Sequence, residues 1–223
     1  MELRDYQKEI VRLGVNVLKE HKFVYLAMEV RTGKTLTSLS ICKTLAVSDV
    51  LFITKKKAIS SIQDDYNLLN PDFNITIINY ESLHKIDSAP YCVIICDEAH
   101  GMGAYPKPSK RAKDVKSLIQ INNNPYVILL SGTPTPESYS QMYHQVYAIP
   151  GNPFKHHKSF YKFAHEYINI TQKKIGPTSI NDYSDGKDSI LYEMKPYMIS
   201  FTQKEAGFKT QITEEILTVA MHE

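Results

Sequence analysis

Cysteine, long apolar runs and an excess of charge of either sign are all scarce in this sequence of 223 residues. Its three cysteines, Cys42, Cys92 and Cys96, are odd in number, which argues against a disulfide framework and favours a reducing compartment with these thiols packed in the core. No stretch approaches the roughly 20 apolar residues of a membrane-spanning helix, and Met1 precedes charged residues instead of an apolar leader. The sequence therefore predicts a soluble, intracellular protein with no membrane partner.

The balance of charge is nearly even, with 26 basic and 24 acidic residues and a formal net charge of +2. Such a balance neither requires nor forbids a polyanionic partner, so a signal for nucleic acid has to be local. The clearest basic run is Lys55, Lys56 and Lys57. A hydrophobic fraction of 43% is typical of a chain that folds around a core, and the length fits one large domain with an appendage.

Apolar runs alternate with amphipathic segments along the first 136 residues. The runs predict strands at 23–28, 50–54, 75–78, 91–96 and 126–130, and helical spacing predicts helices at 3–19, 34–46, 58–69, 81–85 and 109–121. Strands that alternate with helices of this length indicate right-handed crossovers. The predicted fold class is α/β, a mostly parallel sheet with helices on both faces.

The pattern changes beyond residue 136. We predict helices at 137–146 and 158–167, an exposed loop at 171–187 and a final strand at 213–220. These features divide the chain into a domain of residues 1–150 and a helical or irregular extension of residues 151–223. Within the extension, His156 and His157 are adjacent, and adjacent positions on a helix face different ways. We therefore expect an exposed basic patch with Lys155 and Lys158 instead of a metal site.

The first motif with chemical content is Gly33-Lys34-Thr35, between a predicted strand and a predicted helix. Backbone N–H groups at such a helix start can cradle phosphates, Lys34 can reach the β and γ phosphates, and the Thr35 hydroxyl can bind magnesium. Met28 stands where the first glycine of the phosphate-loop pattern is expected. An ordinary strand-to-helix turn is the alternative interpretation of this segment taken alone.

Two adjacent carboxylates, Asp97 and Glu98, end the next strongly apolar strand. Parallel sheets bind their ligands at this end of the strands. Asp97 can hold a magnesium ion, and Glu98 can accept a proton from a water that attacks a γ phosphate. Ser131-Gly132-Thr133 follows the last predicted strand of this region. Taken alone it would be a simple turn.

Together, Leu3-Arg4-Asp5-Tyr6-Gln7, Gly33-Lys34-Thr35, Asp97-Glu98-Ala99-His100 and Ser131-Gly132-Thr133 resemble the first RecA-like lobe of superfamily 2 helicases and translocases, with a DEAH box. The resemblance is strongest to the Swi/Snf-type branch, including phage and bacterial members. It implies a P-loop NTPase fold, ATP and Mg²⁺ as cofactors, and DNA as partner, in the cytoplasm of a bacterial cell or phage-infected host. The implied activity is ATP hydrolysis coupled to movement on DNA.

The resemblance also implies roles for individual residues. The implied catalytic residues are Lys34, Asp97 and Glu98, and the implied magnesium ligands are Thr35 and Asp97. The implied nucleotide-binding residues are Arg4, Gln7, Arg31, Thr32, Gly33, Lys34 and Thr35, with Gln7 reading adenine. The implied nucleic-acid contacts are Thr54, Lys55, Lys56, Tyr80, Glu81 and Ser82. Ser131, Gly132 and Thr133 would couple the nucleotide state to DNA.

The length of the chain leaves two questions open. Two lobes of this type need roughly 300 to 400 residues, so we expect a second RecA-like lobe to come from the same protein or from another chain, and this lobe alone to be weakly active. A motor subunit of a restriction or recombination complex is an alternative within enzymes. A non-hydrolysing module that binds nucleic acid, with Met28 marking an inactive loop, is the alternative from another class.

Overall fold

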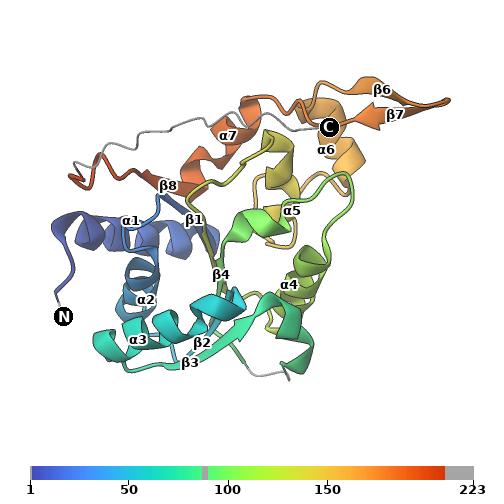
Figure 1. Cartoon of the computed structure of the whole chain (residues 1–223). Helices are drawn as coiled ribbons and strands as arrows, with labels where there is room; N and C mark the ends of the chain where they lie inside the picture. Colours follow the sequence, from blue (N-terminus) through green and yellow to red (C-terminus); the bar gives the residue numbers. More distant parts are fainter. Residues whose placement is uncertain (1, 87–89, 209–223) are drawn as a thin grey trace, which may run out of the picture.

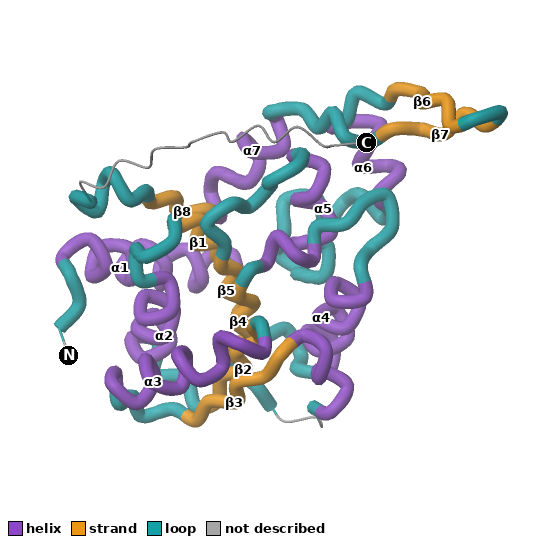
Figure 2. Tube along the Cα trace, in the orientation of Figure 1, coloured by secondary structure: helices purple, strands orange, loops and turns teal. Residues whose placement is uncertain are grey.

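The computed structural model describes residues 2–86 and 90–208, and this part of the chain is built on a six-stranded sheet. The strands lie in the order β3-β2-β4-β5-β1-β8 (Figure 2). Every neighbouring pair is parallel. They are β1 Phe23–Met28, β2 Asp49–Thr54, β3 Asn74–Asn79, β4 Val93–Asp97, β5 Tyr126–Leu130 and β8 Met198–Phe201. Because the strands run the same way, their carboxyl ends meet at one edge of the sheet.

Helices cover both faces of the sheet (Figure 1). One face carries α1 Asp5–His21, α2 Lys34–Thr44 and α3 Ile59–Leu69. The other carries α4 Lys110–Ile121, α5 Met142–Val146, α6 Phe160–Tyr167 and α7 Ser189–Met194. Short 3₁₀ segments connect these elements: η1 Lys56–Ala58, η2 Tyr80–Lys85, η3 Ala99–Met102, η4 Tyr139–Gln141 and η5 Lys195–Tyr197.

The continuous apolar runs follow from this two-sided covering. Along β1, Phe23 and Tyr25 enter the core under α4 to α7, whereas Val24, Leu26 and Met28 enter the core under α1 to α3. Successive side chains of a strand point to opposite faces, so a strand covered on both faces needs an apolar residue at nearly every position. The predicted α/β class is confirmed, and the five predicted strands all form.

The chain beyond residue 136 differs from the prediction in three places. Residues 171–187, predicted as a loop, contain the antiparallel hairpin of β6 Thr171–Ile175 and β7 Thr178–Asp182, which projects from the rest of the ribbon in Figure 1. Residues 137–146 form the 3₁₀ segment η4 and the one-turn helix α5 instead of one helix. β8 was not predicted, because its four residues carry no clear period and its partner β1 lies far away in sequence.

Two predictions on this part of the chain stay as they were. The strand expected at 213–220 falls outside the described residues. The division at residue 150 stays a prediction, although β8, from beyond that point, pairs with β1 and so belongs to the same sheet. Within the described ranges, no helix has both the length and the apolar character needed to cross a bilayer.

Candidate nucleotide-binding site

A cleft with a volume of about 520 Å³ opens at the carboxyl edge of the sheet. Its walls come from the segments that follow β1, β2, β4, β5 and β8. The lining residues are Glu29, Val30, Lys34, Lys55, Glu98, His100, Gly132, Thr133 and Gln203. Segments that are far apart in the sequence meet here because each leaves the sheet at the same edge.

The turn between β1 and α2 forms one wall of the cleft. Gly33 has a φ of 82°, which favours glycine, and a Cβ atom at this position would displace the side-chain amide of Gln7. The loop's other positive φ falls on Arg31, whereas Met28 is the last residue of the strand. The Thr32 hydroxyl donates to Glu29 O at 2.7 Å and closes the turn. Met28 therefore needs none of the freedom of a glycine, and the departure from the loop pattern leaves the turn intact.

Gln7 reaches this loop from the first turn of α1. Its side chain is buried, and its Oε1 atom accepts a hydrogen bond from the backbone of Arg4 at 3.0 Å. The neighbouring Tyr6 hydroxyl donates to Thr32 O at 3.2 Å. The structure thus brings Gln7 and the phosphate-loop sequence into contact, whereas the Arg4 side chain is exposed.

Lys34 is the cation of this wall. Its Nζ atom donates to Met28 O at 2.8 Å and to Glu29 O at 3.1 Å. Burial lowers the pKa of Lys34, and the carboxylates of Asp97 and Glu98 act in the opposite direction. An ammonium group that is half-buried and held only by neutral carbonyls is stabilised when a polyanion binds beside it.

Asp97 is held at the end of β4 by groups from two neighbouring segments. Its Oδ2 atom accepts a hydrogen bond from Thr54 Oγ1 at 2.7 Å, and its backbone oxygen accepts one from the Tyr80 hydroxyl at 2.8 Å. Burial raises the pKa of Asp97, and the bond from Thr54 opposes this effect. A partly buried carboxylate of this kind is stabilised in its charged form by a cation.

Glu98 turns the chain out of the sheet and into the cleft. Its φ of 51° is unusual for a residue other than glycine and places η3 directly behind β4. The carboxylate stands between Lys55 and His100, with Lys55 Nζ at 3.6 Å from Oε1 and His100 Nδ1 at 3.4 Å from Oε2. Because the side chain is about one-third exposed, water can reach it.

His100 connects the acid pair to the end of β5. Its Nδ1 atom lies 2.9 Å from Ser131 Oγ, which also accepts the backbone N–H of Thr133 at 3.1 Å. Ser131 is fully buried, whereas Thr133 is exposed and lines the cleft. The segments after β4 and β5 are therefore joined by one hydroxyl group.

The predicted nucleic-acid contacts do not form one surface. The hydroxyl groups of Thr54 and Tyr80 are committed to Asp97, and both side chains are buried. Glu81 pairs with Arg111 at 2.7 Å, and this guanidinium together with backbone and Asn79 hydrogen bonds lowers the pKa of Glu81 to about 2. Ser82 is half-buried, Lys55 faces Glu98 and Lys56 is exposed. The role of these six residues toward nucleic acid stays a prediction.

The last residue of β8 and the segment after it add contacts that the sequence did not indicate. The Phe201 ring stacks on Tyr6, with centroids 4.6 Å apart. The backbone N–H of Gln203 donates to Glu29 Oε2 at 2.7 Å, and its side-chain amide donates to Val30 O at 3.0 Å. No local pattern could have marked these residues, because their partners lie more than 170 positions earlier in the chain.

Two solved structures share the architecture of this chain. The SWI2/SNF2 ATPase core of Sulfolobus solfataricus, solved in complex with dsDNA, matches with a TM-score of 0.70 and 17% identity over 93% of this chain and 46% of its own. The Hef helicase domain of Pyrococcus furiosus matches with a TM-score of 0.52 and 16% identity over 66% of this chain and 36% of its own. At these identities the likeness concerns the fold. The chain spans less than half of either structure.

The fold and the motif order define the N-terminal RecA-like lobe of a superfamily 2 helicase or translocase. More narrowly, the chain belongs to the family described as "Type III restriction enzyme, res subunit", whose model matches residues 1–136. A comparison with curated proteins found no match. The predicted family resemblance is confirmed at the level of the superfamily and the lobe.

Proposed function

We propose that this chain is the nucleotide-binding lobe of an ATP-dependent DNA helicase or translocase, in which ATP hydrolysis is coupled to movement on DNA. One observation carries the proposal: a single cleft is lined by Lys34, Glu98 and Thr133, which follow three different strands. A cation for phosphates, an acid for water and a residue of the Ser-Gly-Thr segment are brought together only by the fold.

Binding of the nucleotide is assigned to the turn after β1. The N-terminus of α2 offers backbone N–H groups to phosphate oxygens, and Lys34 supplies a positive charge beside them. Gln7 is held against Gly33, where it can meet the adenine edge, with Arg4 on the open side. Arg31 and Thr32 complete the set that we assign to the nucleotide.

Hydrolysis is assigned to the acid pair. The oxygen donors of Thr35 and Asp97 suit Mg²⁺, which would screen the charge of the β and γ phosphates when bound. Thr54 orients the Asp97 carboxylate for this role. Glu98 would accept the proton of the attacking water, and the neighbouring Lys55 and His100 side chains would orient its carboxylate.

Coupling between the nucleotide and DNA is assigned to the two hydrogen bonds of Ser131, one with His100 and one with the backbone of Thr133. A shift at Glu98 reaches His100, then Ser131 and the exposed Thr133, with Gly132 between them. We assign Lys55 and Lys56 to contacts with the phosphate backbone of duplex DNA. Thr54, from the end of β2, and Tyr80, Glu81 and Ser82, from η2, complete the residues that we assign to DNA. The Sulfolobus structure, which contains dsDNA, supports duplex DNA as the partner.

The whole protein would need a second RecA-like lobe facing this cleft. The matched structures are at least twice as long as the part that this chain covers, which supports a partner lobe in the same or another chain. The family match also favours the second candidate, a motor subunit of a restriction complex. A nuclease activity that travels with the motor would distinguish this candidate from a freestanding translocase.

Titration with ATP and Mg²⁺ tests the proposal directly. We expect Lys34→Ala to weaken ATP binding, and Glu98→Gln to leave binding nearly intact while it abolishes hydrolysis. Glu9→Gln, on the exposed side of α1, is the matched control and should change neither. Equal hydrolysis by Glu98→Gln and the native chain would remove Glu98 from the role of base. If the chain binds DNA but no ATP at millimolar concentration, a non-hydrolysing module replaces the motor.

A further inference from the structure

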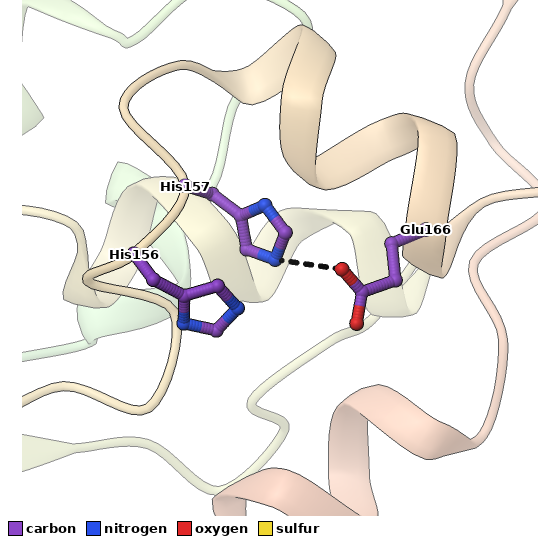
Figure 3. A group of neighbouring side chains, drawn as sticks. All are labelled: His156, His157 and Glu166. Carbon is purple, nitrogen blue, oxygen red and sulfur yellow. Dashed lines mark ion pairs between the residues drawn. The ribbon is translucent and has the colours of Figure 1, made fainter.

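A cluster of three side chains, His156, His157 and Glu166, lies outside the nucleotide cleft. The two histidines precede α6, and Glu166 is on α6 (Figure 3). One ligand atom of each residue lies within 4.8 Å of the other two. None of the three lines the cleft.

The expectation that the two histidines diverge is wrong, because it assumed a helix. Residues 156 and 157 lie in the turn that precedes α6, which begins only at Phe160. In this turn the two rings lie on the same side, with centroids 4.0 Å apart, and both approach the Glu166 carboxylate (Figure 3). The two side chains therefore gather around one point instead of separating.

The His157 imidazole supplies an observation independent of the clustering. Its side chain is only 9% exposed, and its Nε2 atom is buried with no hydrogen-bond partner among the described residues. Glu166 Oε2 is nevertheless 3.2 Å away. The nitrogen therefore does not point straight at the oxygen, as it would in a hydrogen bond between the two.

A separation of 3.2 Å fits an ion pair, and it also fits two ligands of one shared metal ion. Two ligands at about 2.0–2.1 Å from a tetrahedral zinc ion stand roughly 3.3 Å apart, and their lone pairs converge on the ion instead of on each other. Nitrogen and carboxylate ligands together suit zinc and its first-row neighbours better than magnesium or calcium.

The backbone under the cluster is held in place without a metal. The His157 N–H donates to Phe154 O at 2.9 Å, and the Tyr143 hydroxyl donates to His157 O at 2.9 Å. On the other side, Lys187 Nζ donates to the backbone oxygen of Glu166 at 2.7 Å. Lys155 and Lys158 are exposed, where solvent screens their charge.

We propose that His156, His157 and Glu166 bind one divalent transition-metal ion, zinc in the first place, with the fourth position open to water. Bound metal joins the turn of residues 151–159 to α6. The site does not depend on the nucleotide cleft or on the motor function proposed above.

The experiment is a titration of the 223-residue chain with Zn²⁺ in millimolar Mg²⁺, followed by calorimetry. Excess magnesium competes for the oxygen groups of Thr35 and Asp97 proposed to bind it, and the variants described next assign the bound zinc to the new site. We expect one equivalent of zinc at micromolar concentration or tighter. Substitution by Co²⁺ should give the intense visible absorption of a four-coordinate ion.

Variants separate the site from adventitious binding. Glu166→Gln and His156→Ala, both at exposed positions, should each weaken zinc binding beyond the 10- to 100-fold that loss of an outer-shell partner costs. His165→Ala removes a neighbouring exposed imidazole on α6 and should change nothing. The proposal is overturned if zinc fails to bind below millimolar concentration, if neither ligand variant weakens it, or if His165→Ala weakens it equally.

Discussion

At the scale of single residues, the cleft is held together by residues that form hydrogen bonds with more than one neighbour. Ser131 Oγ meets both His100 and the backbone of Thr133, and Asp97 is held by groups from the ends of β2 and β3. Such shared hydrogen bonds fix orientation, because moving one partner disturbs the other. They explain how short motifs that are separate in sequence become one site.

His144 offers a prediction at this scale that concerns stability. It is buried in α5, and since a carbonyl only accepts, its Nδ1–H donates to Ala104 O at 2.7 Å. Burial lowers the pKa of His144 to about 4, from an ordinary value of 6.5. The unfolded chain therefore binds this proton more readily, so the stabilisation is fully present above about pH 6.5 and is lost as the pH falls toward 4.

The loss of stability that His144 causes at low pH can be measured by urea unfolding at pH 7.5 and pH 5. The linkage of this one group amounts to about 2 kcal/mol of lost stability at pH 5. We expect His144→Gln to lose less stability over this interval than the native chain, by roughly that amount. His84→Gln, at an exposed position, should follow the native profile. Parallel profiles for His144→Gln and the native chain would contradict the assignment.

At the scale of elements, helix and strand ends are where the sequence does most to position the site. β1, β4 and β5 each stop at a turn that carries functional groups, and α2 starts directly at Lys34. β8 shows the opposite case, since a short edge strand with no distinctive pattern places Gln203 against the β1 turn. Its position is set by its partner strand.

The helix α4 gives a prediction for an element. Ser109 is its N-cap, and the Ser109 hydroxyl accepts the backbone N–H of Ala112 at 3.1 Å. Ser109→Ala should lower the free energy of unfolding by about 1 kcal/mol, because that N–H loses its partner. Ser117→Ala, at an exposed position inside the same helix, should leave it unchanged or slightly higher. Denaturant unfolding of both variants measures these changes in the free energy of unfolding. An equal loss in Ser109→Ala and Ser117→Ala would argue against a capping role for Ser109.

At the scale of the whole molecule, the charged side chains that line the cleft are two acids, Glu29 and Glu98, and two lysines. Among the described residues, Lys34 and Lys55 are the cations that line it, and no arginine does. Transition states of phosphoryl transfer are strongly stabilised by arginine, by roughly 10³- to 10⁵-fold where an arginine finger acts. We therefore predict that this chain alone hydrolyses ATP near the basal rate, with little stimulation by duplex DNA. Robust DNA-stimulated turnover in a steady-state assay would show that no partner lobe is needed.

Binding of DNA by this chain should be weak and dominated by phosphates. The triple change of Lys55, Lys56 and Lys57 to Ala should weaken binding about equally for unrelated duplexes, and should reduce the slope of log K against log salt by roughly 2 to 3. Fluorescence anisotropy at several salt concentrations measures both. The control triple change of Lys19, Lys43 and Lys113 to Ala removes the same charge from exposed positions elsewhere. If it reduces the slope equally, DNA binds without a defined site.

Much of this protein was accessible from local pattern. Apolar runs located β1 to β5, because a strand buried on both faces needs apolar residues throughout. Turn chemistry located Gly33-Lys34-Thr35 and Asp97-Glu98, because ligands of a parallel sheet gather where its strands end. The sequence by itself therefore determined the α/β class and indicated the residues proposed to carry the chemistry.

Only the tertiary structure decided which of these groups touch. Gln7 packing on Gly33, the hydroxyl of Thr54 turned to Asp97, and β8 beside β1 all join positions that are distant in the chain. His156, His157 and Glu166 gather because the two histidines lie in a turn and not on a helix. Local periodicity reports the face that a residue presents, but the identity of the neighbour on that face is set by packing of the whole chain, which no local pattern contains.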